Sequence, residues 1–187
     1  MCKLLIVCRV EFTNIKCEAV DKEFCTFEYC RLKSVNRTYK YISLKARILQ
    51  LPITNAKVNG ALYQRLNGYK PFLYNITLDC CKFFKNQKSN PVASFFYDTF
   101  KEFSNVNHSC PFNHDIVLDK LTAESINHRV TNILPFPEGQ YMFKLNWNVS
   151  GINRMRSAGR CDAFELVLPP VLMMMKLLPL PVRCFSC

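Results

Sequence analysis

The side chains best suited to chemistry in this 187-residue sequence are eleven cysteines and three histidines, His108, His114 and His128. Cys110 and His114 have a spacing seen in pairs of metal ligands, but the sequence offers no second Cys/His pair of this kind and no two Cys-x2-Cys motifs that could act together. We therefore expect disulfide and surface roles for them, and no metal site. No Gly-x-Ser-x-Gly, His-Glu-x-x-His or glycine-rich phosphate loop occurs, and no pair of carboxylates is marked as an acid/base couple. The sequence thus predicts neither an enzyme nor a cofactor.

The number of cysteines is typical of a secreted chain rather than a cytosolic one. Four Asn-x-Ser/Thr acceptors accompany them, and most lie on the polar face of an expected strand or in a turn. Residues 1–8 hold one Lys and a short apolar run, which resembles the end of a truncated signal sequence, with a first β-strand as the alternative. We expect a secreted, disulfide-bonded glycoprotein with sugars at Asn36, Asn75, Asn107 and Asn148.

The formal net charge is +11, and Lys and Arg are scattered without a run longer than two. Scattered charge of this kind most often forms a solvated basic surface, and attraction to anionic lipid is the alternative. No helix-turn-helix, zinc-finger or RNA-recognition motif is present, so nucleic acid is not an expected partner.

The stretch from Leu66 to Cys110 must position much of the expected fold. Asn67-Gly68 suits a two-residue hairpin turn, and residues 72–79 then alternate between apolar and mostly polar side chains, as in a half-buried strand. An Asn-Pro pair, a good N-cap followed by a good first-turn residue, predicts one short helix near residues 91–103. Cysteines at both ends of the strand-and-helix unit could tie it together.

Other stretches also have strand patterns, the clearest being residues 41–48 and 140–149. About seven short strands with turns between them favour a mainly β, antiparallel, immunoglobulin-like sandwich. Cys17 and Cys30 flank a possible hairpin turn, so a disulfide between them is feasible. The remaining expected strands are residues 10–17, 27–35, 57–65 and 72–79, and a short apolar run follows at 115–118.

The chain changes character after Arg154. Its apolar stretch 166–182 contains four prolines, which rule out a regular transmembrane helix. We expect a sandwich domain at 9–154 and a divergent, poorly ordered tail at 155–187. The cysteines of that tail, Cys161, Cys184 and Cys187, have no assigned pairing.

Aromatic and aliphatic side chains from several strands and the helix are predicted to converge between the sheets. Such residues usually just fill a core, but the sheets could splay and hold a lipid or another hydrophobic ligand. Basic residues at the rim, Lys70, Lys82 and Arg65, could then meet an anionic head group. The candidate pocket residues are Phe72, Tyr74, Ile76, Phe95, Phe96, Phe100, Tyr141, Phe143 and Trp147.

Several motifs, in order, resemble a large insect family of short secreted proteins of unknown function, over about Val10 to Arg154. That family is related to the CheB pheromone-response proteins and, more distantly, to the ganglioside activator and the ML lipid-recognition sandwich. The matching stretches are Phe12–Cys17, Glu28–Arg37, Asn67–Leu73, Asp79–Phe83, Asn105–Pro111 and Leu134–Tyr141.

The resemblance implies an ML-type sandwich with two bridges, Cys17–Cys30 and Cys81–Cys110. Strict alternation would place Cys80 on the inner face, so a bulge or strand end is expected near Asp79, with Cys80 and Cys25 as extra cysteines. The family should supply a last strand after Arg154, but no such pattern is visible, so one sheet is expected to lack an edge strand. The implied function is a lipid-binding or chemosensory accessory protein. The alternative is a glycosylated interaction module with a filled core that binds another protein.

Overall fold

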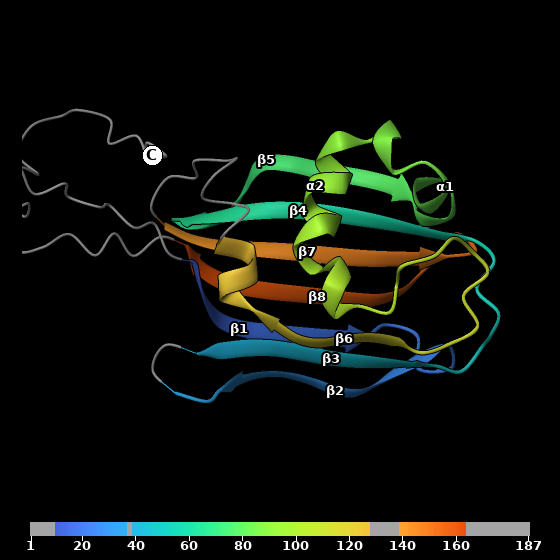
Figure 1. The fold of residues 1–187 in the computed structure, drawn as a ribbon, viewed down its shortest axis with the longest axis horizontal. Coiled ribbons are helices and arrows are strands. Elements are labelled where there is room, and N and C mark those ends of the chain that lie inside the picture. The colour runs from blue at the N-terminus through green and yellow to red at the C-terminus, as the bar shows by residue number, and fades with distance from the viewer. Residues whose placement is uncertain (1–9, 37–38, 128–138, 164–187) are drawn as a thin grey trace, which may run out of the picture.

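Two antiparallel β-sheets form the body of the protein (Figure 1). The computed structural model describes residues 10–36, 39–127 and 139–163, the last five of them as backbone alone. The predicted class, a mainly β antiparallel sandwich, is confirmed. The larger sheet has the order β1-β8-β7-β4-β5, with β1 Val10–Ala19, β4 Ala56–Leu66, β5 Gly68–Asp79, β7 Gly139–Val149 and β8 Ile152–Ala163.

The smaller sheet has the order β2-β3-β6. Its strands are β2 Cys25–Ser34, β3 Lys40–Ile48 and β6 Ile116–Thr122, so the short apolar run noted at 115–118 overlaps the start of a seven-residue strand. A disulfide between Cys17 of β1 and Cys30 of β2 joins the smaller sheet to the edge of the larger one.

β8 fills the position between β1 and β7, where Met155 pairs with Ala19 on one side and Trp147 on the other. The expectation that no strand follows Arg154 is therefore wrong, and residues 155–163 belong to the sandwich rather than to a tail. The alternation in β8 is weak because Ser157 occupies an inward position where a large apolar side chain would have signalled a strand. Residues 164–187, with Cys184 and Cys187, and the leader at 1–8 lie outside the described residues.

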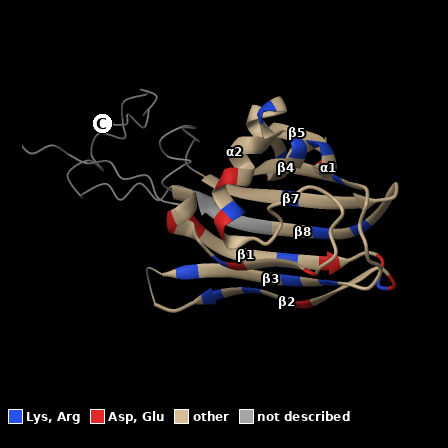
Figure 2. Cartoon of the chain, turned by 45° about the vertical axis from the view of Figure 1, so that its right-hand side comes forward, with Lys and Arg blue, Asp and Glu red and all other residues tan. Residues whose placement is uncertain are grey.

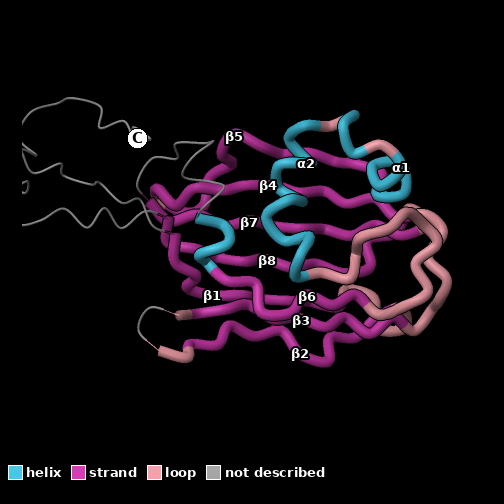
Figure 3. Tube along the Cα trace, viewed as in Figure 1, coloured by secondary structure: helices cyan, strands magenta, loops and turns pink. Residues whose placement is uncertain are grey.

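Residues 80–110, here called the cover segment, form most of the connection from β5 to β6 and contain the helices (Figure 3). The chain passes through α1 (Cys80–Lys85) and η1 (Gln87–Ser89) into α2 (Pro91–Phe100), which crosses one face of the larger sheet. The Asn90 side chain accepts a hydrogen bond from the Ala93 N–H at 3.0 Å, so the expected N-cap is present. A final turn, η2 (Lys101–Phe103), extends the helical region, which confirms the short helix predicted near 91–103.

Asp79 marks the change from strand to helix at the start of the cover segment. β5 ends at this residue, and its carboxylate caps α1 by accepting a hydrogen bond from the Lys82 N–H at 3.0 Å. The strand end expected near Asp79 is therefore present, and it turns Cys80 and Cys81 toward different surroundings, one buried and one only partly so.

An ion pair closes one end of the sandwich. Arg154, just after the β7–β8 turn, binds the carboxylate of Asp21 in the β1–β2 turn, and its guanidinium carbon lies 5.0 Å from the ring centre of Phe24. The Asp21 carboxylate also accepts hydrogen bonds from the N–H groups of Glu23, at 3.0 Å, and Phe24, at 3.3 Å. The hydrogen bond from Arg154, above all, lowers the pKa of Asp21 below its ordinary value.

Replacing Asp21 should therefore have an effect that depends on pH. Because the pKa of Asp21 is lower in the folded protein, its contribution to stability is present above the ordinary carboxyl pKa of about 3.9 and is lost as the pH falls through the folded-state value. We expect Asp21→Asn to lower the melting temperature near neutral pH, and the difference from wild type to shrink below about pH 4. Thermal unfolding between about pH 7 and pH 2.5 measures the melting temperatures of wild type and variant at each pH. Glu18→Gln serves as an exposed-carboxylate control. A difference that stays constant over this range would contradict the expectation.

Candidate functional site

An apolar cavity of about 330 Å³ lies between the two sheets and the cover segment. All eight strands and both α-helices contribute residues to its wall. The volume lies at the lower end of the range of about 300–1,000 Å³ found for small-molecule pockets. The fold therefore contains a space between the sheets, which the sequence left open as the alternative to a filled core.

Aromatic contacts hold α2 against the larger sheet at this cavity. Phe96 of α2 stacks on Phe143 of β7 with ring centres 5.3 Å apart, and it meets Tyr74 of β5 edge to face at 5.7 Å. The hydroxyl of the adjacent Tyr97 donates a hydrogen bond to the Val106 carbonyl at 3.1 Å, which ties α2 to the last part of the cover segment. The helix thus forms a fixed wall of the cavity.

Most of the candidate pocket residues meet at the cavity. Phe72 and Phe95 do not line it; they pack beside it, against a buried cluster of Val10, Leu62 and Tyr141. The candidates that line the cavity are Tyr74, Ile76, Phe96, Phe100, Tyr141, Phe143 and Trp147.

Sequence reasoning missed the wall that the smaller sheet supplies, including Phe27, Ile42 and Leu44. Their alternation marked them as strand residues, but periodicity within one strand does not say which sheet lies opposite. It also missed Gly60, which occupies an inward position of β4. A Cβ at Gly60 would lie 3.5 Å from Leu145 Cδ2 and 3.6 Å from Phe143 Cζ, which are ordinary contact distances, so this glycine helps to leave the space empty.

The basic residues proposed for the rim are not among the residues that line the cavity. Lys70 and Lys82 are exposed, and Arg65 donates from Nη1 to Gln140 Oε1 at 2.6 Å on the outer surface. Figure 2 shows Lys and Arg distributed over both sheets and the region of α1 rather than gathered at one place. The head-group contact expected for Lys70, Lys82 and Arg65 is therefore not supported by their positions.

The structure contains both disulfides that the family resemblance implies, Cys17–Cys30 and Cys81–Cys110. The second closes the cover segment on itself, because its two cysteines lie near the two ends of that segment. Cys25 and Cys80 are buried free thiols, which agrees with their treatment as extra cysteines.

The Cys80 thiol, which lines the cavity, should react very slowly with alkylating reagents in the folded protein. Burial raises its pKa to about 12, with the nearby Asp79 carboxylate adding to the effect. At about pH 8 the thiolate population, and with it the alkylation rate, should be roughly a thousandfold below that of an ordinary exposed cysteine. Peptide mapping after a short iodoacetamide pulse, with and without urea, measures this for each cysteine. Rapid labelling of Cys80 without urea would contradict the burial.

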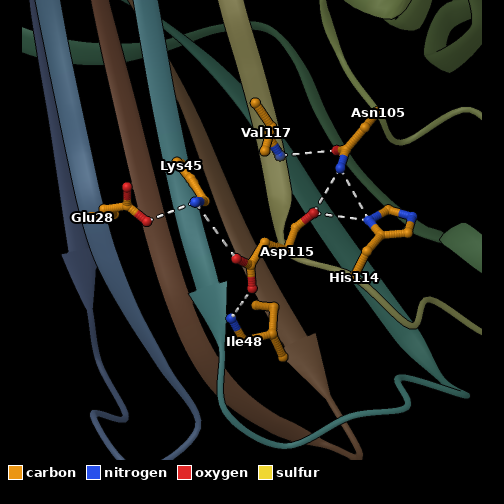
Figure 4. Close-up of polar contacts among 7 residues, drawn as sticks. All are labelled: Glu28, Lys45, Ile48, Asn105, His114, Asp115 and Val117. Atoms are coloured by element: carbon orange, nitrogen blue, oxygen red, sulfur yellow. Dashed lines mark hydrogen bonds and ion pairs between the residues drawn. The ribbon is translucent and has the colours of Figure 1, made fainter.

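A polar network holds the chain that follows Cys110 against β6 (Figure 4). Asn105 Oδ1 accepts from the Val117 N–H at 2.9 Å, and its Nδ2 donates to the Asp115 carbonyl at 2.7 Å. The Asp115 carboxylate accepts from the Ile48 N–H at 3.0 Å and lies 3.9 Å from the Lys45 ammonium group. The network therefore fixes the return of the cover segment to the smaller sheet.

His108 and His114 also make polar contacts in this region. His114 Nδ1 lies 3.0 Å from Asn105 Nδ2, and its Nε2 lies 2.9 Å from Nε2 of His108. His108 Nδ1 lies 2.8 Å from the Ser109 carbonyl, and His114 Nδ1 also lies 2.8 Å from the Asp115 carbonyl. Cys110, the other half of the spacing noted in the sequence, is held in a disulfide. Within the described part of the chain, no three His, Cys, Asp or Glu side chains converge as metal ligands.

Three of the four expected glycosylation acceptors have exposed side chains: Asn36, Asn75 and Asn107. Asn148 is partly buried on β7. Asn75 Oδ1 accepts from Asn59 Nδ2 at 2.8 Å on the outward face of the larger sheet. None of the helices in the described ranges is long and apolar enough to cross a membrane.

Fold and site together define this chain as a disulfide-bonded β-sandwich with an apolar cavity between its sheets. Residues 58–143 match the sequence model of a family described as "Protein of unknown function (DUF1091)". The match covers less than half of the chain, running from β4 through the cover segment and β6 into β7, and so includes Cys81–Cys110. No match to a curated protein was found.

Proposed function

We propose that this protein is a secreted carrier that binds a lipid or another hydrophobic small molecule between its two sheets. The observation that carries the proposal is the cavity of about 330 Å³ with apolar walls from both sheets and α2. Protein interiors normally pack without voids larger than a water molecule, so a cavity of this size is costly unless it has an occupant. A binding role, rather than catalysis, is what such a cavity best supports.

Secretion is the second part of the proposal. Two disulfides support it, because such bonds persist in oxidising compartments and are rare in the cytosol. The exposed acceptors Asn75 and Asn107 are accessible to sugar transfer. The finer proposal, a chemosensory accessory protein related to the CheB and ML lipid-recognition proteins, rests on the motif resemblance alone.

The alternative was an interaction module with a filled core that binds an extracellular or receptor protein. We prefer the carrier because the space between the sheets is hollow and apolar rather than filled. The exposed large apolar residues of the described surface, such as Leu66 and Leu73, give no independent reason to choose a protein partner, since single exposed apolar side chains are common.

Binding of a neutral fluorescent apolar probe tests the proposal. Titration of purified, oxidised protein with N-phenyl-1-naphthylamine should give saturable, blue-shifted emission with one site per chain. Extraction of protein secreted from insect cells, followed by mass spectrometry, should recover a co-purifying lipid. Absence of both signals from correctly disulfide-bonded protein would overturn the carrier function.

A further inference from the structure

We propose that the ligand is uncharged along its whole buried length, as in an ester, alcohol or hydrocarbon chain, and that carboxylates are rejected. This inference rests on the carrier function proposed above. It follows from where the described residues place charge near the cavity and from the hydrogen bonds that the hydroxyl groups at the helical wall already make.

The hydroxyl groups at the helical wall are engaged within the protein. Tyr97 donates to the Val106 carbonyl at 3.1 Å, and Thr99 donates to the Phe96 carbonyl at 2.6 Å. Ser104 Oγ accepts from the Val106 N–H at 3.2 Å. All three side chains border the cavity, and the Tyr97 and Thr99 hydroxyls already donate to backbone carbonyls, so these two offer an incoming carboxylate little compensation.

Arg156 is the one charged residue among the described residues that line the cavity. Its neighbours in β8, Met155 and Ser157, lie at inward positions on either side of it, so strand alternation points the guanidinium outward. The Arg156 side chain is exposed and lies 4.0 Å from the Glu18 carboxylate on β1. No cation of the described residues would therefore lie beside a carboxylate inside the cavity.

Burying an unpaired carboxylate is strongly unfavourable, and such groups bind a proton instead. A fatty acid would thus enter in its protonated form. Above its ordinary pKa of about 4.5, the protonated fraction of the acid in solution falls about tenfold for each pH unit. The apparent affinity for the acid should then fall about tenfold per pH unit, whereas the affinity for its methyl ester should not change with pH.

Competition against N-phenyl-1-naphthylamine with dodecanoic acid and methyl dodecanoate tests this. At about pH 7.5 we expect the ester to compete at least tenfold better, and the acid to improve about tenfold per unit as the pH is lowered toward 5.5. Equal competition at about pH 7.5 would overturn the inference while leaving the carrier function intact. If neither the probe nor the ester binds, the carrier function fails and this inference fails with it.

A charge introduced at the wall provides a second test. Ser157→Lys places an amine at an inward position of β8, and we expect it to shift the acid-to-ester preference toward the acid by at least tenfold. Ser157→Met has similar length without the charge and should leave the preference unchanged. An unchanged preference in folded Ser157→Lys would count against the inference.

Discussion

Gly60→Leu should weaken probe binding at least tenfold while the protein remains folded. Gly60 is an inward position of β4 at the cavity wall, and the atoms nearest to a Cβ there belong to the side chains of Leu145 and Phe143, at 3.5–3.8 Å. A leucine can therefore be accommodated by projecting into the empty volume, where it competes with the ligand. Replacing glycine in a strand and filling a cavity both favour folding, so the melting temperature should stay the same or rise.

Two control variants accompany this prediction. Gly60→Ala adds only the Cβ and should leave the probe affinity within about twofold, because ordinary contacts are not disturbed. Lys57→Leu adds a leucine at an exposed position of the same strand and should not affect binding. Unchanged binding by folded Gly60→Leu would place the ligand outside the cavity. A large fall in melting temperature would mean that the cavity cannot accept the added side chain.

Removal of the Cys81–Cys110 disulfide should both destabilise the protein and weaken ligand binding. The two cysteines are 29 residues apart, and loop-closure entropy for a loop of that length corresponds to about 3.5 kcal/mol. The double variant Cys81→Ser/Cys110→Ser should lose about that much free energy of unfolding. Because the bond closes the cover segment, which carries Phe96 and Phe100 to the cavity, the probe affinity should fall as well.

The other disulfide supplies the matched comparison. Cys17 and Cys30 are 13 residues apart, so Cys17→Ser/Cys30→Ser should lose about 3 kcal/mol by the same reasoning. That bond joins the two sheets at β1 and β2, away from α2, and we expect the smaller effect on binding. Urea unfolding and probe titration of both variants measure the two effects separately. A greater loss of binding in the Cys17/Cys30 variant would show that sheet separation, not the cover segment, controls access.

The local elements of this fold are readable from the sequence because their signals are local. Alternation at period two marks β3 and β7, and a capping Asn followed by Pro marks the start of α2. The inward-facing aromatic residues of β5, α2 and β7 follow from the same periodicities, which is why most of the predicted pocket residues do line the cavity.

The tertiary structure alone decided the position of β8, the empty space at Gly60 and the exclusion of Phe72 and Phe95 from the cavity. Met155 and Ser157 give a weak alternation, yet pairing with strands on both sides holds β8 in the middle of the sheet. Periodicity reports which face of a strand is buried, but not what lies opposite that face. A cavity is the space that side chains from many strands fail to fill, so it exists only once those strands are assembled.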